Sequence, residues 1–396
     1  MLVLRNARLI QELTEGYEDR YGDVVIDQGV IQEIKPAKSV SAAQEEIIDL
    51  NGKTLLPGLI EAHLHLDLEG SSTFEENVQP DAYRTMCCLQ RAQDNLRRGY
   101  TTVRDLGDRN NITLGVARAI REGKVTGPDV LVSGKIITPT EAGNEFFGDM
   151  YAEADSPAEF VKAVRRQYQL GVDWIKIMGT GAVMNPGGTP GSAIIFEEEL
   201  QAACRAANTV GVPVAVHCHG SEGVKMCIRN GVRTVEHSSI IDEECIRLYQ
   251  EAEGKTYPIP TMSPMANFVE FPDDKPKHYV VKGGALLGKI IDGLHAYKEA
   301  GIKIGWGTDA GVYVGSHGNG IYEFRARVNM AGFTPLECLI QATKNNAEIL
   351  MIDDQVGTIA CGKRANLVAF NGNPDENIDA VDDVALVIKA GEIVRL

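Results

Sequence analysis

One repeated unit dominates the middle of the chain, from about residue 55 to residue 350. In each copy a helical stretch ends at a glycine, and a short apolar run follows at once. Glycine is favoured just past a helix end because it adopts positive φ without a Cβ clash. The glycines in this position are Gly99, Gly171, Gly211, Gly231, Gly254 and Gly301. Apolar runs at 55–66 and 129–134 bring the predicted strands to eight. Eight strands alternating with helices predict an α/β fold, a closed (β/α)8 barrel of the TIM type.

The sequence also predicts where two helices within the repeat begin. Ser156-Pro157-Ala158-Glu159 and Thr334-Pro335-Leu336-Glu337 each combine a capping box with proline at the first helical position. An open, doubly wound sheet is the alternative for such a pattern. That fold usually carries a glycine-rich dinucleotide turn after its first strand, and no such turn follows the run at 55–66. The barrel is therefore the preferred prediction.

The sequence pattern at the two ends of the chain is different and predicts short strands separated by turns. Val24-Val25-Ile26 and Val30-Ile31 flank Asp27-Gln28-Gly29, which is a hairpin signal. Residues 365–370 and 384–394 alternate in the same way. We expect residues 1–54 and 355–396 to meet in one small composite β-sandwich domain, and residues 55–354 to form the barrel.

Composition narrows the class of partner. The net charge is −16, from 55 acidic and 39 basic residues, which argues against nucleic acid and anionic membranes as partners. No apolar run approaches the about 20 residues of a membrane span, and the start lacks the pattern of a signal peptide. The eight cysteines include no Cys-x-x-Cys pair. We therefore expect a cytoplasmic enzyme with a small-molecule substrate, and a homo-oligomer.

Potential metal ligands fall where the predicted strands end, which is the face that barrel enzymes use for catalysis. His63 and His65 are two residues apart, so a strand presents both imidazoles to one side. Neutral imidazole is the commonest metal ligand. Further strand ends carry Lys176, then His217 and His219, then His237, and finally Asp309.

Lys176 lies inside an apolar strand, where an ammonium is costly unless it is paired or neutralised. One interpretation is an ion pair with a carboxylate such as Asp309. The other is that the neutral amine reacts with carbon dioxide, and the resulting carbamate (N6-carboxylysine) bridges two cations. Asp309 likewise either caps a turn or holds a metal and accepts a proton from water. A histidine-rich, oxygen-bridged site suits two divalent ions, with Zn²⁺ expected.

These residues, in this order on separate strands, resemble the amidohydrolase superfamily. The stretches that carry the resemblance are Pro57-Gly58-Leu59-Ile60-Glu61-Ala62-His63-Leu64-His65, Lys176, His217, His237 and Gly307-Thr308-Asp309. Within the superfamily the chain is most similar to the imidazolonepropionase-like branch, which includes Xaa-Pro dipeptidases and N-acyl amino acid hydrolases. Residues 99–107, 179–186 and 217–220 support this branch.

The resemblance implies a set of roles. His63, His65 and Asp309 would hold the more buried metal, His217 and His237 the second, and carboxylated Lys176 would bridge them. A metal-bridging hydroxide would attack the amide carbonyl of a dipeptide or N-acyl amino acid. Asp309 would pass the proton to the leaving nitrogen. His219 would contact the substrate or support a ligand rather than bind metal itself.

The chain departs from this branch at the loop after the third strand. Its peptidases usually carry Gly-Gly-His there, whereas this chain has Thr138-Pro139-Thr140-Glu141-Ala142-Gly143-Asn144. That loop can face the substrate, so it bears on dipeptide specificity. Hydrolysis of a cyclic amide (imidazolone, hydantoin or lactam) is the main alternative, because the same two-metal chemistry serves it. A mononuclear deaminase is disfavoured because Gly220 stands where those enzymes carry an acid and because Lys176 is present. A non-catalytic binding protein is disfavoured because all six ligand positions are filled.

Overall fold

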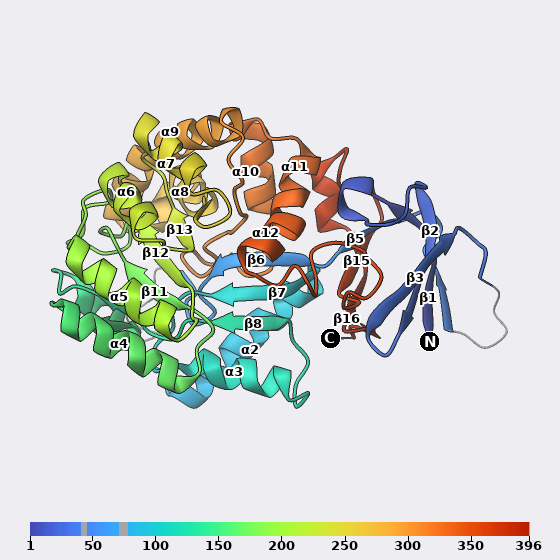
Figure 1. The fold of residues 1–396 in the computed structure, drawn as a ribbon, viewed down its shortest axis with the longest axis horizontal. Helices are drawn as coiled ribbons and strands as arrows, with labels where there is room; N and C mark the ends of the chain where they lie inside the picture. The colour runs from blue at the N-terminus through green and yellow to red at the C-terminus, as the bar shows by residue number, and fades with distance from the viewer. Residues whose placement is uncertain (41–45, 71–77, 396) are drawn as a thin grey trace.

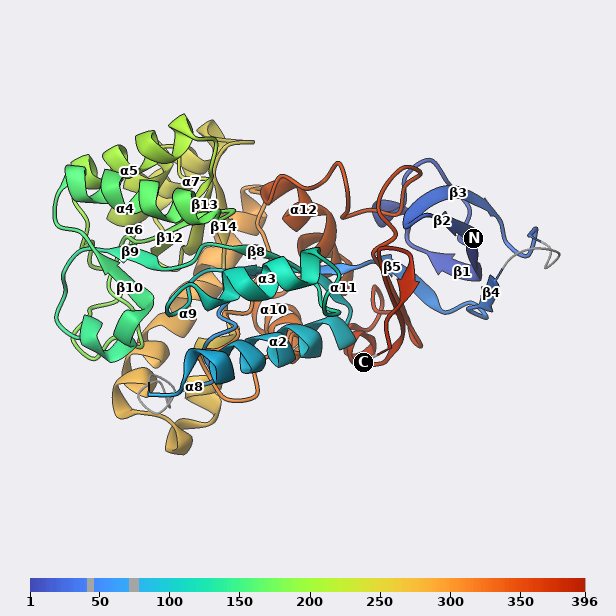
Figure 2. The ribbon, with the colours of Figure 1, turned by 90° about the horizontal axis from the view of Figure 1, so that it is seen from below.

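The computed structural model describes residues 1–40, 46–70 and 78–395. It has two parts, a large barrel surrounded by helices and a small sheet that contains both chain termini (Figures 1 and 2). None of the helices in these ranges is long and apolar enough to cross a membrane.

The barrel wall is built from parallel strands in the order of the sequence. Pairing runs from β6 through β7 to β8, and from β9 through β11, β12 and β13 to β14. The bounds are β6 Leu59–Leu64, β7 Tyr100–Asp105, β8 Asp129–Val132, β9 Ile136–Thr138, β11 Ile175–Met178, β12 Val214–Cys218, β13 Thr234–His237 and β14 Tyr257–Ile259. The predicted (β/α)8 fold is confirmed.

The last barrel segment has extended backbone but too few regular pairs to form a strand. Gly305 donates its N–H to Pro258 O at 3.0 Å, which joins the segment to β14. On its other side Ala62 N–H reaches Trp306 O at 3.3 Å, and His65 N–H reaches Ala310 O at 2.8 Å. These bonds close the ring between β14 and β6, and they place residues 305–310 beside the first strand.

Helices follow the wall segments and cover the outside of the barrel. Ser156 caps α4, because its side chain accepts the Glu159 N–H, and Gly171 ends the helix at φ 84°. The predicted capping box is not completed there, because Glu159 Oε2 accepts from the Asp155 N–H instead. The Thr334 capping box of α11 is confirmed. The helices are α2 Asp81–Arg97, α3 Ile112–Arg121, α4 Pro157–Leu170, α5 Glu197–Thr209, α6 Ser221–Arg229, α7 Glu243–Glu251, α8 Ser263–Glu270, α9 Lys277–Glu299, α10 Ile321–Ala331, α11 Pro335–Ile340 and α12 Asn346–Ile349.

Both chain ends contribute to one eight-stranded sheet, as expected for a composite terminal domain. Its strands are β1 Leu2–Leu9, β2 Tyr21–Asp27, β3 Val30–Pro36, β4 Glu46–Asp49, β5 Thr54–Pro57, β15 Leu367–Phe370, β16 Val384–Lys389 and β17 Glu392–Ile393. The β2–β3 turn contains Gln28 and Gly29, both at positive φ, as the hairpin signal predicted. The sheet curls on itself, so that Gly29 O accepts the Ala365 N–H at 2.8 Å.

Two predicted strands are each divided in the structure. The run at 55–66 was expected to be one barrel strand, but β5 pairs with β1 and β15 of the terminal sheet, and only β6 lies in the barrel. The run after residue 129 breaks at Gly134, which has φ 64°. There β8 pairs with β7 while β9 pairs with β11 and with the short strand β10, Tyr151–Glu153.

Candidate active site

The carboxyl ends of the barrel strands surround a cavity, and all seven predicted site residues line it or lie at its base. One group consists of His63 and His65 at the end of β6 and Asp309 in the closing segment. Their potential ligand atoms lie within 4.8 Å of one another. Asp309 Oδ1 is 3.4 Å from His63 Nε2 and 3.5 Å from His65 Nε2. Asp309 reaches the two imidazoles because its N–H bonds to His63 O at 2.7 Å.

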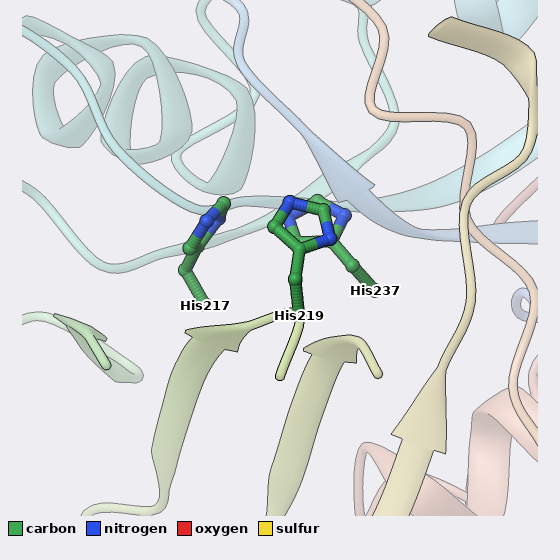
Figure 3. Close-up of side chains that lie close together, drawn as sticks. All are labelled: His217, His219 and His237. Carbon is green, nitrogen blue, oxygen red and sulfur yellow. The ribbon is translucent and has the colours of Figure 1, made fainter. Parts of the chain in front are cut away.

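A second group comes from the next strands along the wall. The potential ligand atoms of His217, His219 and His237 also lie within 4.8 Å of one another. Figure 3 shows the three rings converging above the ends of β12 and β13. His219 and His237 stack with their centroids 4.7 Å apart. The geometry thus gives His219 the same position relative to its neighbours that a metal ligand would have.

Hydrogen bonds fix which nitrogen each imidazole presents to the cavity. His65 Nδ1 lies 3.1 Å from Gly107 O, and His237 Nδ1 lies 2.8 Å from Thr261 Oγ1. His219 Nδ1 lies 2.9 Å from Ser239 Oγ. Each of these three rings therefore has Nε2 available, and such partners are typical of metal-binding histidines.

Lys176 on β11 is buried at the base of the same cavity. Its Nζ has no hydrogen-bond partner within the described part of the chain, so the ion pair with Asp309 that the sequence allowed is not formed. Burial lowers the pKa of Lys176 to about 8, although the charges of Glu236 and Asp309 oppose the shift. Such an amine is partly neutral near pH 7, which is the form that reacts with carbon dioxide.

Glu236 and Arg104 form a buried charged pair beneath the imidazoles. Glu236 Oε2 accepts the His63 Nδ1–H at 2.7 Å, and Oε1 accepts from Arg104 Nη2 at 3.0 Å. Burial opposes the ionisation of Glu236, but Arg104 and His63 outweigh it and lower its pKa to about 2. The ionised carboxylate holds the proton of His63 on Nδ1. His63 Nε2, which is buried and has no hydrogen-bond partner among the described residues, is then a free lone pair.

Two of the predicted ligands have left-handed backbone, at φ 68° for His237 and φ 55° for Asp309. This region is uncommon for residues other than glycine, and such strain concentrates at functional sites. At His237 it has a direct effect. Alternation would turn Glu236 away from the interior if His237 faces it, yet both side chains point inward.

The donor set fits divalent metal ions. Hydrogen bonds hold the imidazoles of His63, His65, His219 and His237 with Nε2 facing the cavity. Burial lowers the pKa of all five imidazoles at the site, including that of His217, so they are neutral near pH 7. Neutral imidazole with one or two carboxylate oxygens is the preferred environment of Zn²⁺ and similar ions. The unpartnered His63 Nε2 and Lys176 Nζ are the atoms that an ion and a carbamate would satisfy.

The upper wall of the cavity is apolar. Its largest side chains are Met150, Met178, Met184, Met265, Phe147 and Tyr151. They come from the segment after the third strand, from the end of β11 and the loop after it, and from α8, which follows the seventh strand.

A model of the amidohydrolase family matches residues 54–394. The chain belongs to the amidohydrolase family. It is similar to the crystal structure of a Xaa-Pro dipeptidase with methionine bound in its active site, at TM-score 0.91 and 32% identity, covering 99% of both chains. A prolidase complexed with N-methylphosphonate-L-proline has TM-score 0.89 and 29% identity, covering 100% of this chain and 99% of that one. Ochratoxinase of Aspergillus niger is 28% identical over 376 residues, which span 86% of this chain and 75% of that protein.

These relatives confirm the predicted superfamily, and this amidohydrolase acts on C–N bonds. Divalent metal ions are the typical cofactors of the family. Sequence reasoning found the seven histidine, lysine and aspartate side chains at the cavity, but it found neither the apolar upper wall nor the groups that support the imidazoles. It missed the Glu236–Arg104 pair, Thr261 and Ser239. It also missed Glu61, whose Oε1 accepts the His63 and Thr308 N–H groups. The sequence did contain a signal for Glu61: it is two residues from His63 in the same strand, so strand alternation places both side chains on one face.

Proposed function

We propose that this amidohydrolase cleaves an acyclic amide bond at a binuclear metal site. His63, His65 and Asp309 would hold one ion, and His217 and His237 the other. Carboxylated Lys176 would bridge them. The observation that supports this assignment is the arrangement of two ligand groups in one cavity with an unpartnered, buried lysine whose charge acts on both groups. The ions would supply an activated water and polarise the substrate carbonyl.

The protein's own residues account for orientation and proton transfer. Asp309 is buried beside the imidazoles and its pKa is raised by burial, so it is a competent proton acceptor and donor. It would take a proton from the attacking water and deliver it to the leaving nitrogen. His219, fixed through Nδ1 by Ser239, presents Nε2 to the cavity. We assign it the role of contacting the substrate carbonyl.

Metal content and amide hydrolysis, measured on one sample, test the proposal. The protein is stripped with a chelator and reloaded with Zn²⁺ and ¹³C-bicarbonate. We expect two ions per chain by elemental analysis, a carbamate carbon by ¹³C NMR, and amine release from a panel of N-acyl amino acids, dipeptides and anilides. One ion per chain without the carbamate signal would contradict the bridge. Two ions without turnover of any acyclic amide would favour ring opening of a cyclic amide.

A further inference from the structure

The cavity wall above the predicted metal ligands is made almost wholly of apolar side chains. Met150, Met178, Met184 and Met265 contribute thioethers, and Phe147 and Tyr151 contribute rings. Methionine is flexible and polarisable, so such a wall adapts to bulky apolar groups. Among the described residues that line the cavity, Lys176 is the one with an ammonium or guanidinium group. In the proposed function that amine becomes part of an anionic bridge.

Basic side chains near the rim are already engaged. Lys282 on α9 donates to Asn185 O at 2.6 Å and to Gly188 O at 2.5 Å, which pins the loop after β11. Arg84 donates to Asp67 Oδ1 at 3.1 Å. Residues 41–45, 71–77 and 396 contain no lysine, arginine or histidine in the sequence. A substrate carboxylate therefore has no free basic side chain to bind among the described residues of this wall.

The loop after the third strand, where the sequence departs from dipeptidase-like relatives, also offers no basic side chain to a substrate carboxylate. Ile136 and Phe147 face the cavity from this region. Asn144 does not, because its Nδ2 bonds to Pro139 O at 3.1 Å and to Glu153 Oε1 at 2.8 Å. Glu141 is a nearby acid, bonded by Asn185 at 3.2 Å. Among the described residues, this side of the cavity therefore contributes apolar side chains to the lining and no basic one.

We infer that the substrate is an amide whose group beside the scissile bond is bulky, apolar and uncharged, rather than the charged end of a dipeptide. The inference rests on the proposed function for the reaction and on the wall for the selectivity. A second, anionic group of the substrate would lie against the apolar wall, where no described lining residue other than Lys176 carries an ammonium or guanidinium group. Such burial is strongly unfavourable.

Isosteric substrate pairs isolate the charge. 4-Isopropylacetanilide and 4-acetamidobenzoate share the scissile bond and the ring, and an isopropyl group has nearly the shape of a carboxylate. 4-Isopropylbenzamide and 4-carbamoylbenzoate place the same difference on the acyl side. With the Zn²⁺-loaded protein we expect kcat/KM at least 100-fold higher for the uncharged member of one or both pairs, and lower still for Leu-Pro.

A variant pair assigns the effect to the wall. Met184→Lys adds an ammonium at the cavity, and we expect it to reduce the preference for the uncharged substrate at least tenfold. Met330→Lys is the matched control, because Met330 on α10 is 40% exposed and lies outside the cavity. It should leave the ratio within twofold.

The outcomes separate the two proposals. Faster hydrolysis of Leu-Pro or of the carboxylates would overturn the inference while the amide hydrolase stands. If nothing is hydrolysed, the proposed function fails, and binding still tests the wall. 4-Isopropylaniline should then raise the midpoint of thermal unfolding more than 4-aminobenzoate does, and equal shifts would count against the inference. The wild-type comparison stands alone if Met184→Lys does not fold.

Discussion

Glu236→Gln is the most informative single change at this site, because the two carboxylate oxygens of Glu236 face two donors. Oε2 accepts from His63 Nδ1 and Oε1 accepts from Arg104 Nη2. Glutamine has nearly the same shape but one acceptor and one NH₂ group. If its oxygen faces Arg104, its NH₂ faces His63. The imidazole can then satisfy that NH₂ only by moving its proton to Nε2, the nitrogen that faces Asp309.

The expected loss in metal affinity follows from this tautomer change. Removing an outer hydrogen-bond partner of a metal-binding histidine typically costs 10–100-fold in affinity, which is about 1.4–2.7 kcal/mol. The same change leaves the buried Arg104 without its counter-charge, so the free energy of unfolding should also fall, by about 3–5 kcal/mol. Zn²⁺ affinity is measured by competition with a chromophoric chelator. The His63 tautomer is read by ¹⁵N NMR of the metal-free protein.

Glu323→Gln is the matched control for this experiment. Glu323 is equally buried and accepts from Arg327 Nε at 2.7 Å and from the Met262 and Ser263 N–H groups, but it contacts no predicted ligand. We expect it to lose stability and to keep Zn²⁺ affinity within twofold. If Glu236→Gln behaves the same way, with unchanged affinity and tautomer, Glu236 is merely the counter-ion of Arg104 and the reasoning is refuted.

Three further changes probe the bridge and the loop above it. Lys176→Ala should lower the metal content below two ions per chain, with partial recovery in acetate, and an unaltered metal content would refute the bridge. Because the pKa of Lys176 is lowered to about 8, its reactive neutral form increases as pH rises through 8. Metal uptake at constant dissolved carbon dioxide should rise over the same range, and a flat profile would contradict carboxylation. Gly220→Ala puts a Cβ 1.9 Å from the Gly191 carbonyl oxygen, so KM should rise severalfold and metal content should fall. Gly115→Ala in α3, where a Cβ meets nothing within 4 Å, should change neither.

The positions of the predicted ligands were accessible from sequence because they depend on two local rules. Strand alternation places His63 with His65 and His217 with His219 on one side. Parallel strands in a barrel bring their carboxyl ends together. Neither rule needs knowledge of loop conformation, so the cavity base could be predicted from spacing alone.

Glu236 could not be found in this way because the rule breaks next to it. Glu236 lies on the inward face of β13 together with Thr234, because Arg104 donates to both side chains. With extended backbone the His237 ring would then point toward the surrounding helices, but the left-handed φ of His237 turns it inward as well. The closing segment was likewise placed correctly but does not form a regular strand, since it makes too few regular pairs with β14 and β6. At His237 and in residues 305–310 the backbone conformation depends on tertiary packing, which a local sequence pattern does not predict.

The apolar wall connects the choice of substrate with the protonation of the ligands. Burial is the main cause of the lowered pKa values of His65, His217 and His237. The methionines that line the cavity are part of what excludes water from these imidazoles. Opening the wall to water would move those pKa values back toward 6.5, and protons would then compete with metal at mildly acidic pH. A new cation in the wall would lower them further. The segments that carry Met150, Met184 and Met265 thus shape the substrate pocket and, because they also exclude water, keep the imidazoles in the neutral form that binds metal.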